Sequence, residues 1–286
     1  MRSDAGHFDL IAPGSLREVL SLLAQSPGEL TPIAGGTETM VAFGAGRLQA
    51  KKLVSLWGLK ELRFIATTPE ILTIGAGTTF TDIRNSRVIA SDFPLLAQAA
   101  SWTGSIANQN RGTIGGNIVN GSPAADSPPA LLAYGAEIEL ISVRGSRKLA
   151  YNGFHLTYKK TQLAVDELVY AIHLSRGFDG YRQYARKVGT RNAQAISKVA
   201  IAALARMQGG VIEDIRIGAA SLREIPLRCS GVEQVLTGKR LDIKAIQEAR
   251  VALAQEIRPI DDIRSTSSYR AAVAGNLLVE FLSKLA

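Results

Sequence analysis

The chain has 286 residues, which is long enough to bury one large core or two moderate ones, so we expect two or three lobes. Hydrophobic residues make up 46% and charged residues 20% of the sequence, a balance that is ordinary for a folded protein and excludes extended disorder. The formal net charge is +8, but the basic residues are scattered, so we expect an anionic ligand or an acidic partner rather than nucleic acid.

Cysteine usage and hydropathy exclude further classes of protein. The single cysteine, Cys229, excludes an internal disulfide and cannot by itself hold an iron–sulfur cluster or a structural zinc ion. The first ten residues lack the apolar core of a signal peptide, and no later stretch is apolar enough to span a bilayer. We therefore expect a cytoplasmic protein with no metal site and no membrane span, and any electron-transfer cluster must belong to another chain.

The N-terminal segment predicts a small α/β lobe over residues 1–56. Ser15 can cap a helix whose apolar residues recur with a helical period, and Pro27 and Gly28 close that helix. The other expected elements are a strand at residues 7–12, a strand into a glycine turn at 30–36, a helix at 37–45 and a strand at 52–55. Such a unit is in the size range of a small α/β lobe.

The middle segment predicts a second α+β lobe over residues 57–176. A helix over residues 92–102 has Asp92 as its expected cap and Pro94 in its first turn. The other expected elements are a hairpin of strands 62–66 and 71–75, a glycine- and asparagine-rich loop at 104–121, a short helix at 130–134, and strands at 136–143 and 167–174.

The remaining segment predicts a C-terminal α+β domain over residues 177–286. Its expected strands lie at residues 181–187, 195–203 and 212–220 and form a three-stranded antiparallel sheet. Two helices follow, one capped by Asp242 and one that begins after Ser267 and Ser268.

A first glycine loop, PIAGGTET, lies at residues 32–39 between a predicted strand and a predicted helix. Glycine lets the backbone approach a ligand closely, and successive N–H groups at a helix start favour an anion such as a pyrophosphate. The loop matches neither G-x-G-x-x-G nor G-x-x-x-x-G-K-[ST], so dinucleotide-binding Rossmann and P-loop interpretations lose their main support. Taken alone, it is better explained as a tight strand-to-helix turn.

A second glycine- and amide-rich run, NQNRGTIGGN, lies at residues 108–117 and continues to SPAADSP at 122–128. It has little apolar surface to bury and many polar groups to satisfy. A disordered loop is the simple alternative, but the paired prolines and the neighbouring helix favour an ordered loop that wraps a ligand. The two loops together fit one extended, phosphate-containing ligand between two lobes.

These motifs resemble those of a known family. The strings AGGT at residues 34–37 and TIGGN at 113–117, followed by Ser122, Pro123 and Asp126, are similar to the two FAD-binding motifs of the flavin subunits of molybdenum hydroxylases. Further matches lie at residues 45–47, 131–133, 187–191, 193–198 and 268–270, so the resemblance covers nearly the whole chain. It implies an α+β fold, with a two-lobed FAD-binding domain of the vanillyl-alcohol oxidase and p-cresol methylhydroxylase type followed by the C-terminal domain.

The resemblance also implies a non-covalent FAD site, with no catalytic residue assigned. The residues expected to wrap the diphosphate are Ile33, Ala34, Gly35, Gly36, Thr37, Glu38 and Thr39; those of the second motif, at the diphosphate and ribityl groups, are Thr113, Ile114, Gly115, Gly116 and Asn117. Asp126 matches the family's acidic FAD ligand, and Thr103 lies where the family often has a larger aromatic residue near the cofactor. Val169 matches an aliphatic residue beside the isoalloxazine ring, with ordinary strand packing as an equal alternative, and Lys187 matches a basic residue near the flavin.

The implied function is that of an electron-transfer subunit. It would take electrons from a [2Fe–2S] small subunit and pass them through FAD to NAD+ or another acceptor, while a molybdopterin-binding large subunit oxidises the substrate. We hypothesise that Arg111 and Lys187 stabilise the reduced, anionic flavin. The histidines His7, His155 and His173 are isolated and are interpreted as surface or structural residues. The lone Cys229 excludes the 4-hydroxybenzoyl-CoA reductase branch, whose flavin subunits carry an additional cysteine cluster.

Two alternatives stay open on the sequence. One is a self-contained flavin oxidase or dehydrogenase of the same superfamily, which would need its own substrate pocket. The other is a basic binding or scaffold protein whose glycine loops are degenerate.

Overall fold

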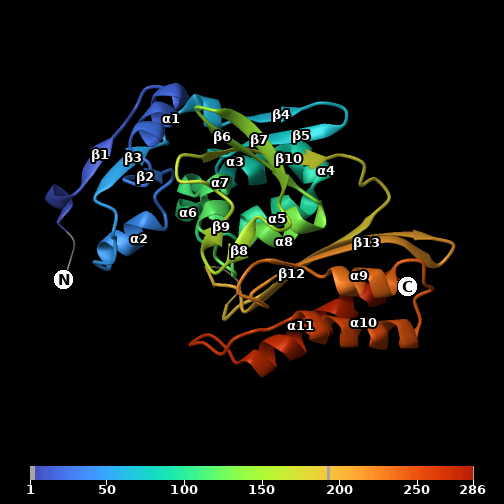
Figure 1. Cartoon of the computed structure of the whole chain (residues 1–286). Coiled ribbons are helices and arrows are strands. Elements are labelled where there is room, and N and C mark those ends of the chain that lie inside the picture. The colour runs from blue at the N-terminus through green and yellow to red at the C-terminus, as the bar shows by residue number, and fades with distance from the viewer. Residues whose placement is uncertain (1–3, 192–193, 286) are drawn as a thin grey trace.

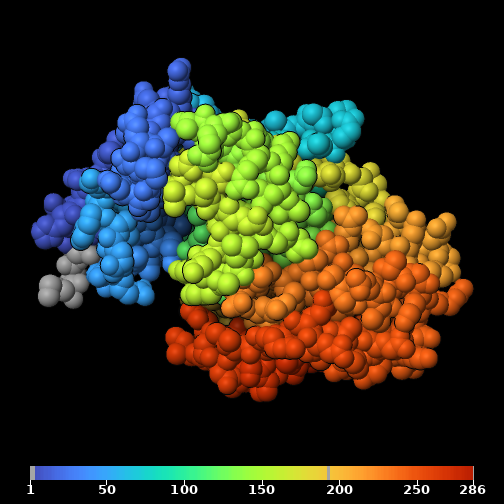
Figure 2. Space-filling model, viewed as in Figure 1, coloured from blue at the N-terminus to red at the C-terminus, as the bar shows by residue number. Residues whose placement is uncertain are grey.

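The computed structural model describes residues 4–191 and 194–285. Three larger sheets follow one another along the described part of the chain, and Figure 1 shows the N-terminal lobe, the second lobe and the C-terminal domain as successive parts. In the space-filling view of Figure 2, the second lobe touches the N-terminal lobe on one side and the C-terminal domain on the other. The described residues contain no helix whose length and hydropathy would let it cross a membrane.

The N-terminal lobe is a three-stranded sheet with the order β1-β3-β2 and parallel pairing throughout. Its elements are a 3-10 turn η1 (Ala5–His7), β1 (Asp9–Ile11), α1 (Leu16–Gln25), β2 (Leu30–Ile33), α2 (Thr39–Gly44) and β3 (Lys52–Ser55). Ser15 caps α1 by accepting a hydrogen bond from the N–H of Glu18, as predicted. Because β2 and β3 are parallel, the first glycine loop and the residues after Ser55 leave the sheet at the same edge.

The second lobe is an antiparallel sheet of order β4-β5-β10-β6-β7. Its strands are β4 (Ile65–Thr67), β5 (Ile71–Gly75), β6 (Glu137–Ser142), β7 (Gly145–Ala150) and β10 (Leu168–Ser175), and a small hairpin is formed by β8 (His155–Thr157) and β9 (Lys160–Thr161). Its helical elements are η2 (Lys60–Leu62), α3 (Phe80–Asn85), α4 (Arg87–Asp92), α5 (Pro94–Trp102), α6 (Ile106–Arg111), α7 (Ile114–Val119) and α8 (Ser127–Ala133). The predicted hairpin is confirmed, although its first strand begins at Ile65.

Two details of this lobe differ from the sequence prediction. Asp92 does not cap α5, because it is the last residue of α4, a helix that Ser86 begins by accepting a hydrogen bond from the N–H of Ile89. Phe93 separates the two helices, and its backbone is kept out of the helical region because Pro94 follows it. The run 104–121 is not an irregular loop, since it contains α6 and α7.

The C-terminal domain is an antiparallel sheet of order β11-β12-β13-β14 with helices on one face. Its elements are β11 (Arg182–Val188), β12 (Val199–Gln208), β13 (Val211–Ala220), β14 (Leu227–Arg228), α9 (Ser230–Leu236), α10 (Ile243–Glu256) and α11 (Ser267–Ser283). The three long strands and the Asp242 cap of α10 are confirmed, and the two-residue β14 adds a short fourth strand. The middle strand begins at Val199 rather than at residue 195.

Each of the three larger sheets packs on a buried core, but the core of the N-terminal lobe also contains Leu59, Leu62 and Leu168 of the second lobe, and the core of the second lobe contains Ala202 and Leu204 of the C-terminal sheet. The boundaries at residues 56 and 176 therefore stay predictions. The C-terminal sheet packs against α8: a Cβ on Gly218 would lie 2.1 Å from the carbonyl oxygen of Pro129. This contact requires glycine and fixes the sheet against the second lobe.

Candidate functional site

The two glycine motifs, which come from different lobes, meet in space. A Cβ on Gly35 would lie 1.6 Å from the carbonyl oxygen of Arg111, so no other residue fits there without moving one of the two segments. The side chain of Arg111 returns the contact, because its Nε donates a 3.3 Å hydrogen bond to the carbonyl oxygen of Gly35. The two loops therefore lie side by side, while their joint binding of one extended ligand stays a prediction.

The first loop has free backbone donors. Gly36 has a φ of +76°, and the carbonyl oxygens of Gly36 and Glu38 accept the first hydrogen bonds of α2. The N–H groups of residues 35–39 donate no hydrogen bond within the described part of the chain. Successive free N–H groups of this kind form a concave surface that suits an anion.

The second motif has no such free donors at the start of α7. The N–H groups of Ile114 and Gly115 donate to the carbonyl oxygens of Thr78 and Ala76, at 3.0 and 2.9 Å. Gly116 donates to the side chain of Thr113, which caps the helix, and Asn117 donates to the Thr113 carbonyl. The glycines of this motif therefore allow close packing on the segment after β5: a Cβ on Gly115 would lie 2.6 Å from the Cβ of Ala76.

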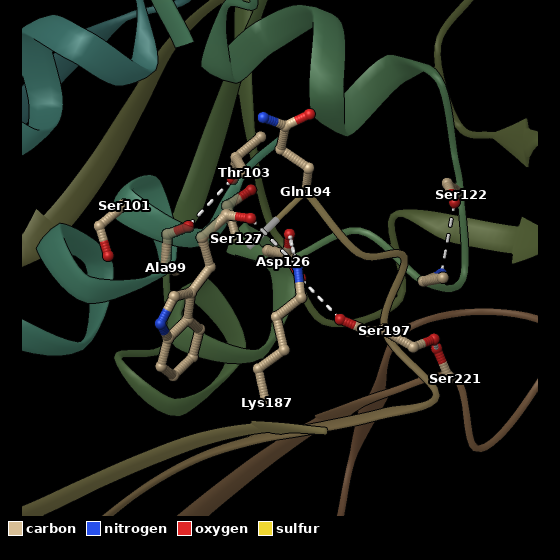
Figure 3. Close-up of polar contacts among 12 residues, drawn as sticks. Ala99, Ser101, Thr103, Ser122, Asp126, Ser127, Lys187, Gln194, Ser197 and Ser221 are labelled. Atoms are coloured by element: carbon tan, nitrogen blue, oxygen red, sulfur yellow. Dashed lines mark hydrogen bonds and ion pairs between the residues drawn. The ribbon is translucent and has the colours of Figure 1, made fainter. Parts of the chain in front are cut away.

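A buried charged cluster lies where the second lobe meets the C-terminal domain, and Figure 3 shows its side chains. The ammonium of Lys187, from β11, lies 2.7 Å from Asp126 Oδ2 and donates to the carbonyl oxygen of Trp102 at 3.1 Å. Ser197 donates a 2.7 Å hydrogen bond to the other carboxylate oxygen of Asp126. The side chains of Asp126 and Lys187 are only 9% and 11% exposed, so each needs the other as a partner.

The electrostatics of this cluster are dominated by burial. Burial raises the pKa of the Asp126 carboxyl, and the Lys187 ammonium and the Ser197 hydroxyl offset that effect only in part. Lys187 has three N–H donors and uses two of them within residues 4–191 and 194–285, so one remains to meet a ligand group.

The other predicted site residues lie around these two groups. Asn117 accepts a 2.7 Å hydrogen bond from Ser127, next to Asp126, and so joins the second motif to the charged cluster. Thr103 ends α5 next to Trp102, and its hydroxyl donates to the Ala99 carbonyl at 3.0 Å.

Val169 is 6% exposed in the core of the second sheet, at an irregularity in the pairing of β10 with β6. Packing in the core of the sheet is enough to explain why an aliphatic residue stands at this position. Its proximity to a flavin ring stays a prediction.

The sequence analysis missed three residues of the site. No site role was assigned to Trp57, Trp102 or Ser197, because each acts through a contact with a residue distant in sequence. Arg111 and Lys187, which we had hypothesised to act together, make no contact with each other: Arg111 lies with Gly35 and Trp57, and Lys187 lies in the charged cluster.

The histidines and potential metal ligands add no catalytic group. His173 lies between Glu139 and Thr73, at 2.8 and 3.1 Å, which is a structural environment. His155 contacts the hydroxyl of Tyr151, and burial lowers the pKa of His155 to about 4. Among residues 4–191 and 194–285, no group of side chains is arranged to hold a metal ion.

Comparisons with known proteins give consistent results along the chain. Residues 6–175 match the model of the FAD-binding domain in molybdopterin dehydrogenase, and residues 184–285 match that of the carbon monoxide dehydrogenase flavoprotein C-terminal domain. The xanthine dehydrogenase FAD-binding subunit of Escherichia coli O157:H7 is 29% identical over 272 residues, covering 94% of this chain and 93% of the relative.

Two further relatives extend over nearly the full chain. The glyceraldehyde dehydrogenase medium chain of Sulfolobus acidocaldarius is 30% identical over 279 residues, covering 98% of both chains. Among solved structures, a chain of carbon monoxide dehydrogenase from Hydrogenophaga pseudoflava superposes with a TM-score of 0.94 at 28% identity, covering 100% of both chains.

Proposed function

The chain belongs to the family of FAD-binding medium subunits of molybdenum hydroxylases, and we propose that it passes electrons from the iron–sulfur clusters of a partner subunit through FAD to NAD+ or another acceptor. The observation that best supports this role is the close contact of the two glycine motifs, the first of which presents unpaired N–H groups within the described part of the chain. The partners we propose are a molybdopterin-binding large subunit and a [2Fe–2S] small subunit. The relatives named medium chains support this proposal.

The residues present fit FAD. The free N–H groups of residues 35–39 suit the diphosphate, and the contact of Gly35 with Arg111 leaves room for no side chain between the two loops. The proposed FAD contacts are those expected from the sequence: Ile33, Ala34, Gly35, Gly36, Thr37, Glu38, Thr39, Thr103, Thr113, Ile114, Gly115, Gly116, Asn117, Asp126, Val169 and Lys187. The bound flavin supplies the ability to accept electrons singly and release them as a pair.

The side chains of the charged cluster would bind the flavin and orient one another. Lys187 has one donor left for the flavin, and its positive charge favours a ligand that gains negative charge on reduction. Asp126 holds the Lys187 ammonium in place, and Ser197 orients the Asp126 carboxylate. Because all three lie at the junction of two domains, closure of that junction also excludes water from them.

The role of Lys187 is tested with Lys187→Met and the matched control Lys148→Met, whose lysine is exposed on β7. We expect the reduction potential of the bound flavin to fall in Lys187→Met, since the reduced anion loses a nearby cation, and to stay unchanged in the control. The measurement is a redox titration of protein saturated with FAD. An unchanged potential in Lys187→Met would show that this lysine does not stabilise the reduced flavin.

The proposed partners and acceptor are tested on the full chain purified from its native host by an affinity tag. We expect released FAD together with co-purifying subunits that contain molybdenum and iron, and we expect NADH to bleach the flavin absorbance without oxygen if NAD+ is the acceptor. A chain that purifies alone and oxidises a small substrate by itself would favour a self-contained flavin oxidase. A colourless chain that takes up no added FAD would contradict the proposal.

A further inference from the structure

Arg111 is a cation without an acidic partner. No carboxylate of the described residues forms an ion pair with it, and its only hydrogen bond runs from Nε to the carbonyl oxygen of Gly35. A guanidinium has five N–H donors, so four of them have no partner. By contrast, the neighbouring Arg63 is neutralised by Asp82 through two bonds of 2.9 and 3.1 Å.

Trp57 fixes the position of this guanidinium. The Cζ of Arg111 lies 3.7 Å from the centre of the Trp57 ring, which is a cation–π contact. The N–H of Leu56 bonds the carbonyl oxygen of Ile33, and the N–H of Trp57 bonds the hydroxyl of Ser55, so the indole is anchored to the ends of β2 and β3. Stacking restricts the plane of the guanidinium and consumes none of its N–H groups.

Among the described residues, the free backbone donors of the two glycine motifs all lie in the first loop. The N–H groups of residues 35–39 are unpaired, whereas those at the start of α7, in the second motif, are already bonded within the chain. Arg111 lies against Gly35, at the edge of the unpaired set. An anion that binds between the two motifs therefore finds its donors in the first loop and in Arg111.

We infer that Arg111 binds the diphosphate of FAD and that Trp57 is the positioning residue that holds it there. This inference rests on the proposed FAD site and replaces our hypothesis that Arg111 stabilises the reduced flavin ring. Arg111 makes no contact with Asp126 or Lys187, and its two planar N–H pairs suit phosphate oxygens.

The inference is tested by titrating the apoprotein with FAD and with riboflavin, which has the same ring and no phosphate. We expect Arg111→Met to weaken FAD binding roughly tenfold or more, as for loss of a charge-assisted hydrogen bond, and to leave riboflavin binding unchanged. Trp57→Ala should weaken FAD binding about two- to fivefold, in keeping with a cation–π contact, and Trp57→Phe should restore most of it. When Arg111→Met and Trp57→Ala are combined, FAD binding should be little weaker than with Arg111→Met alone, because Trp57 acts through Arg111.

Arg63→Met is the matched control, since Arg63 also lies beside Trp57 but is already paired. We expect its FAD affinity to match the wild type. The inference would be overturned if Arg111→Met bound FAD as tightly as the wild type, or if it lost as much affinity for riboflavin as for FAD. A shift in the flavin reduction potential with no change in FAD affinity would also overturn it. If the wild-type chain itself bound no FAD, the proposed function would fail, which is a different outcome from an Arg111→Met variant that binds FAD normally.

Discussion

His155 is a histidine kept neutral by its surroundings. It is 6% exposed, its Nε2 contacts the Tyr151 hydroxyl at 3.1 Å, and its Nδ1 has no hydrogen-bond partner. Burial lowers the pKa of His155 to about 4, whereas in the unfolded chain a histidine titrates near 6.5. Its contribution to stability is therefore fully present above about pH 6.5 and is lost as the pH falls toward 4.

We predict that the free energy of unfolding falls between pH 6.5 and pH 4 more steeply in the wild type than in His155→Gln. One proton taken up on unfolding corresponds to a slope of about 1.4 kcal/mol per pH unit. Urea unfolding at a series of pH values measures this slope, and the difference between the two proteins removes the carboxylates that titrate in the same range. His7→Gln, which alters an exposed histidine, should keep the wild-type slope; equal slopes for the wild type and His155→Gln would contradict the prediction.

At the scale of single residues, the sequence indicated which residues could bind a ligand, but it did not indicate which other residues they contact in the fold. Gly35 and Gly115 were predicted as FAD contacts, and in the structure a Cβ on either would clash with the protein itself. The partners in those approaches, the Arg111 carbonyl and Ala76, could not be predicted, because they depend on how two lobes pack. Trp57 was missed for the same reason, since an aromatic residue after a strand has no local feature that reveals a stacking partner.

Among the elements, α11 has a function beyond covering the C-terminal sheet. Its Arg270 is 3% exposed, donates to the Lys198 carbonyl at 2.6 Å and pairs with Asp262 at 2.8 Å. The N–H of Lys198 bonds the carbonyl oxygen of Val188, so Arg270 braces the strand ends that carry Lys187 and Ser197. The last helix is thereby connected to the buried charged cluster.

We predict that Arg270→Met lowers the free energy of unfolding by about 1.5 to 3 kcal/mol, typical of hydrogen bonds to a charged group, and also weakens FAD binding. Arg264→Met is the control, because Arg264 pairs with the same Asp262 from an exposed position and should change neither quantity much. Denaturant unfolding and FAD titration provide the two measurements. Normal FAD affinity in a folded Arg270→Met protein would show that the brace does not reach the cluster.

Helices whose cap is followed by periodic apolar residues were predicted correctly. Helices whose cap is combined with residues that disfavour a helix were not. The caps at Ser15 and Asp242, followed by periodic apolar residues, identified α1 and α10. Asp92 was misassigned because an aspartate before Pro94 looks like a cap, although Ser86 had already begun a separate helix. The helices α6 and α7 were missed because their glycine and asparagine residues disfavour helices, and the caps at Ser105 and Thr113 outweigh that preference only in the folded lobe.

For the whole molecule, the attachment of the C-terminal sheet to α8 is the contact most open to a test. A Cβ on Gly218 would lie 2.1 Å from the Pro129 carbonyl, whereas a Cβ on Gly58 would meet nothing within 4 Å. We predict that Gly218→Ala separates the two surfaces, lowers the unfolding midpoint and increases protease sensitivity near residues 176–181, while Gly58→Ala does neither. Limited proteolysis and thermal unfolding check this; a wild-type digestion pattern in Gly218→Ala would show that the junction tolerates the displacement.

The order of the lobes was predicted from the sequence pattern, while their mutual contacts required the structure. Asp126 belongs to the region that matches the FAD-binding domain, and Lys187 to the region that matches the flavoprotein C-terminal domain. A chimera that joined the FAD-binding region of this protein to the C-terminal region of a relative would keep the charge of Asp126 balanced only if the incoming strand carried a cation at the position of Lys187. The two regions are therefore exchangeable between relatives only as a matched pair.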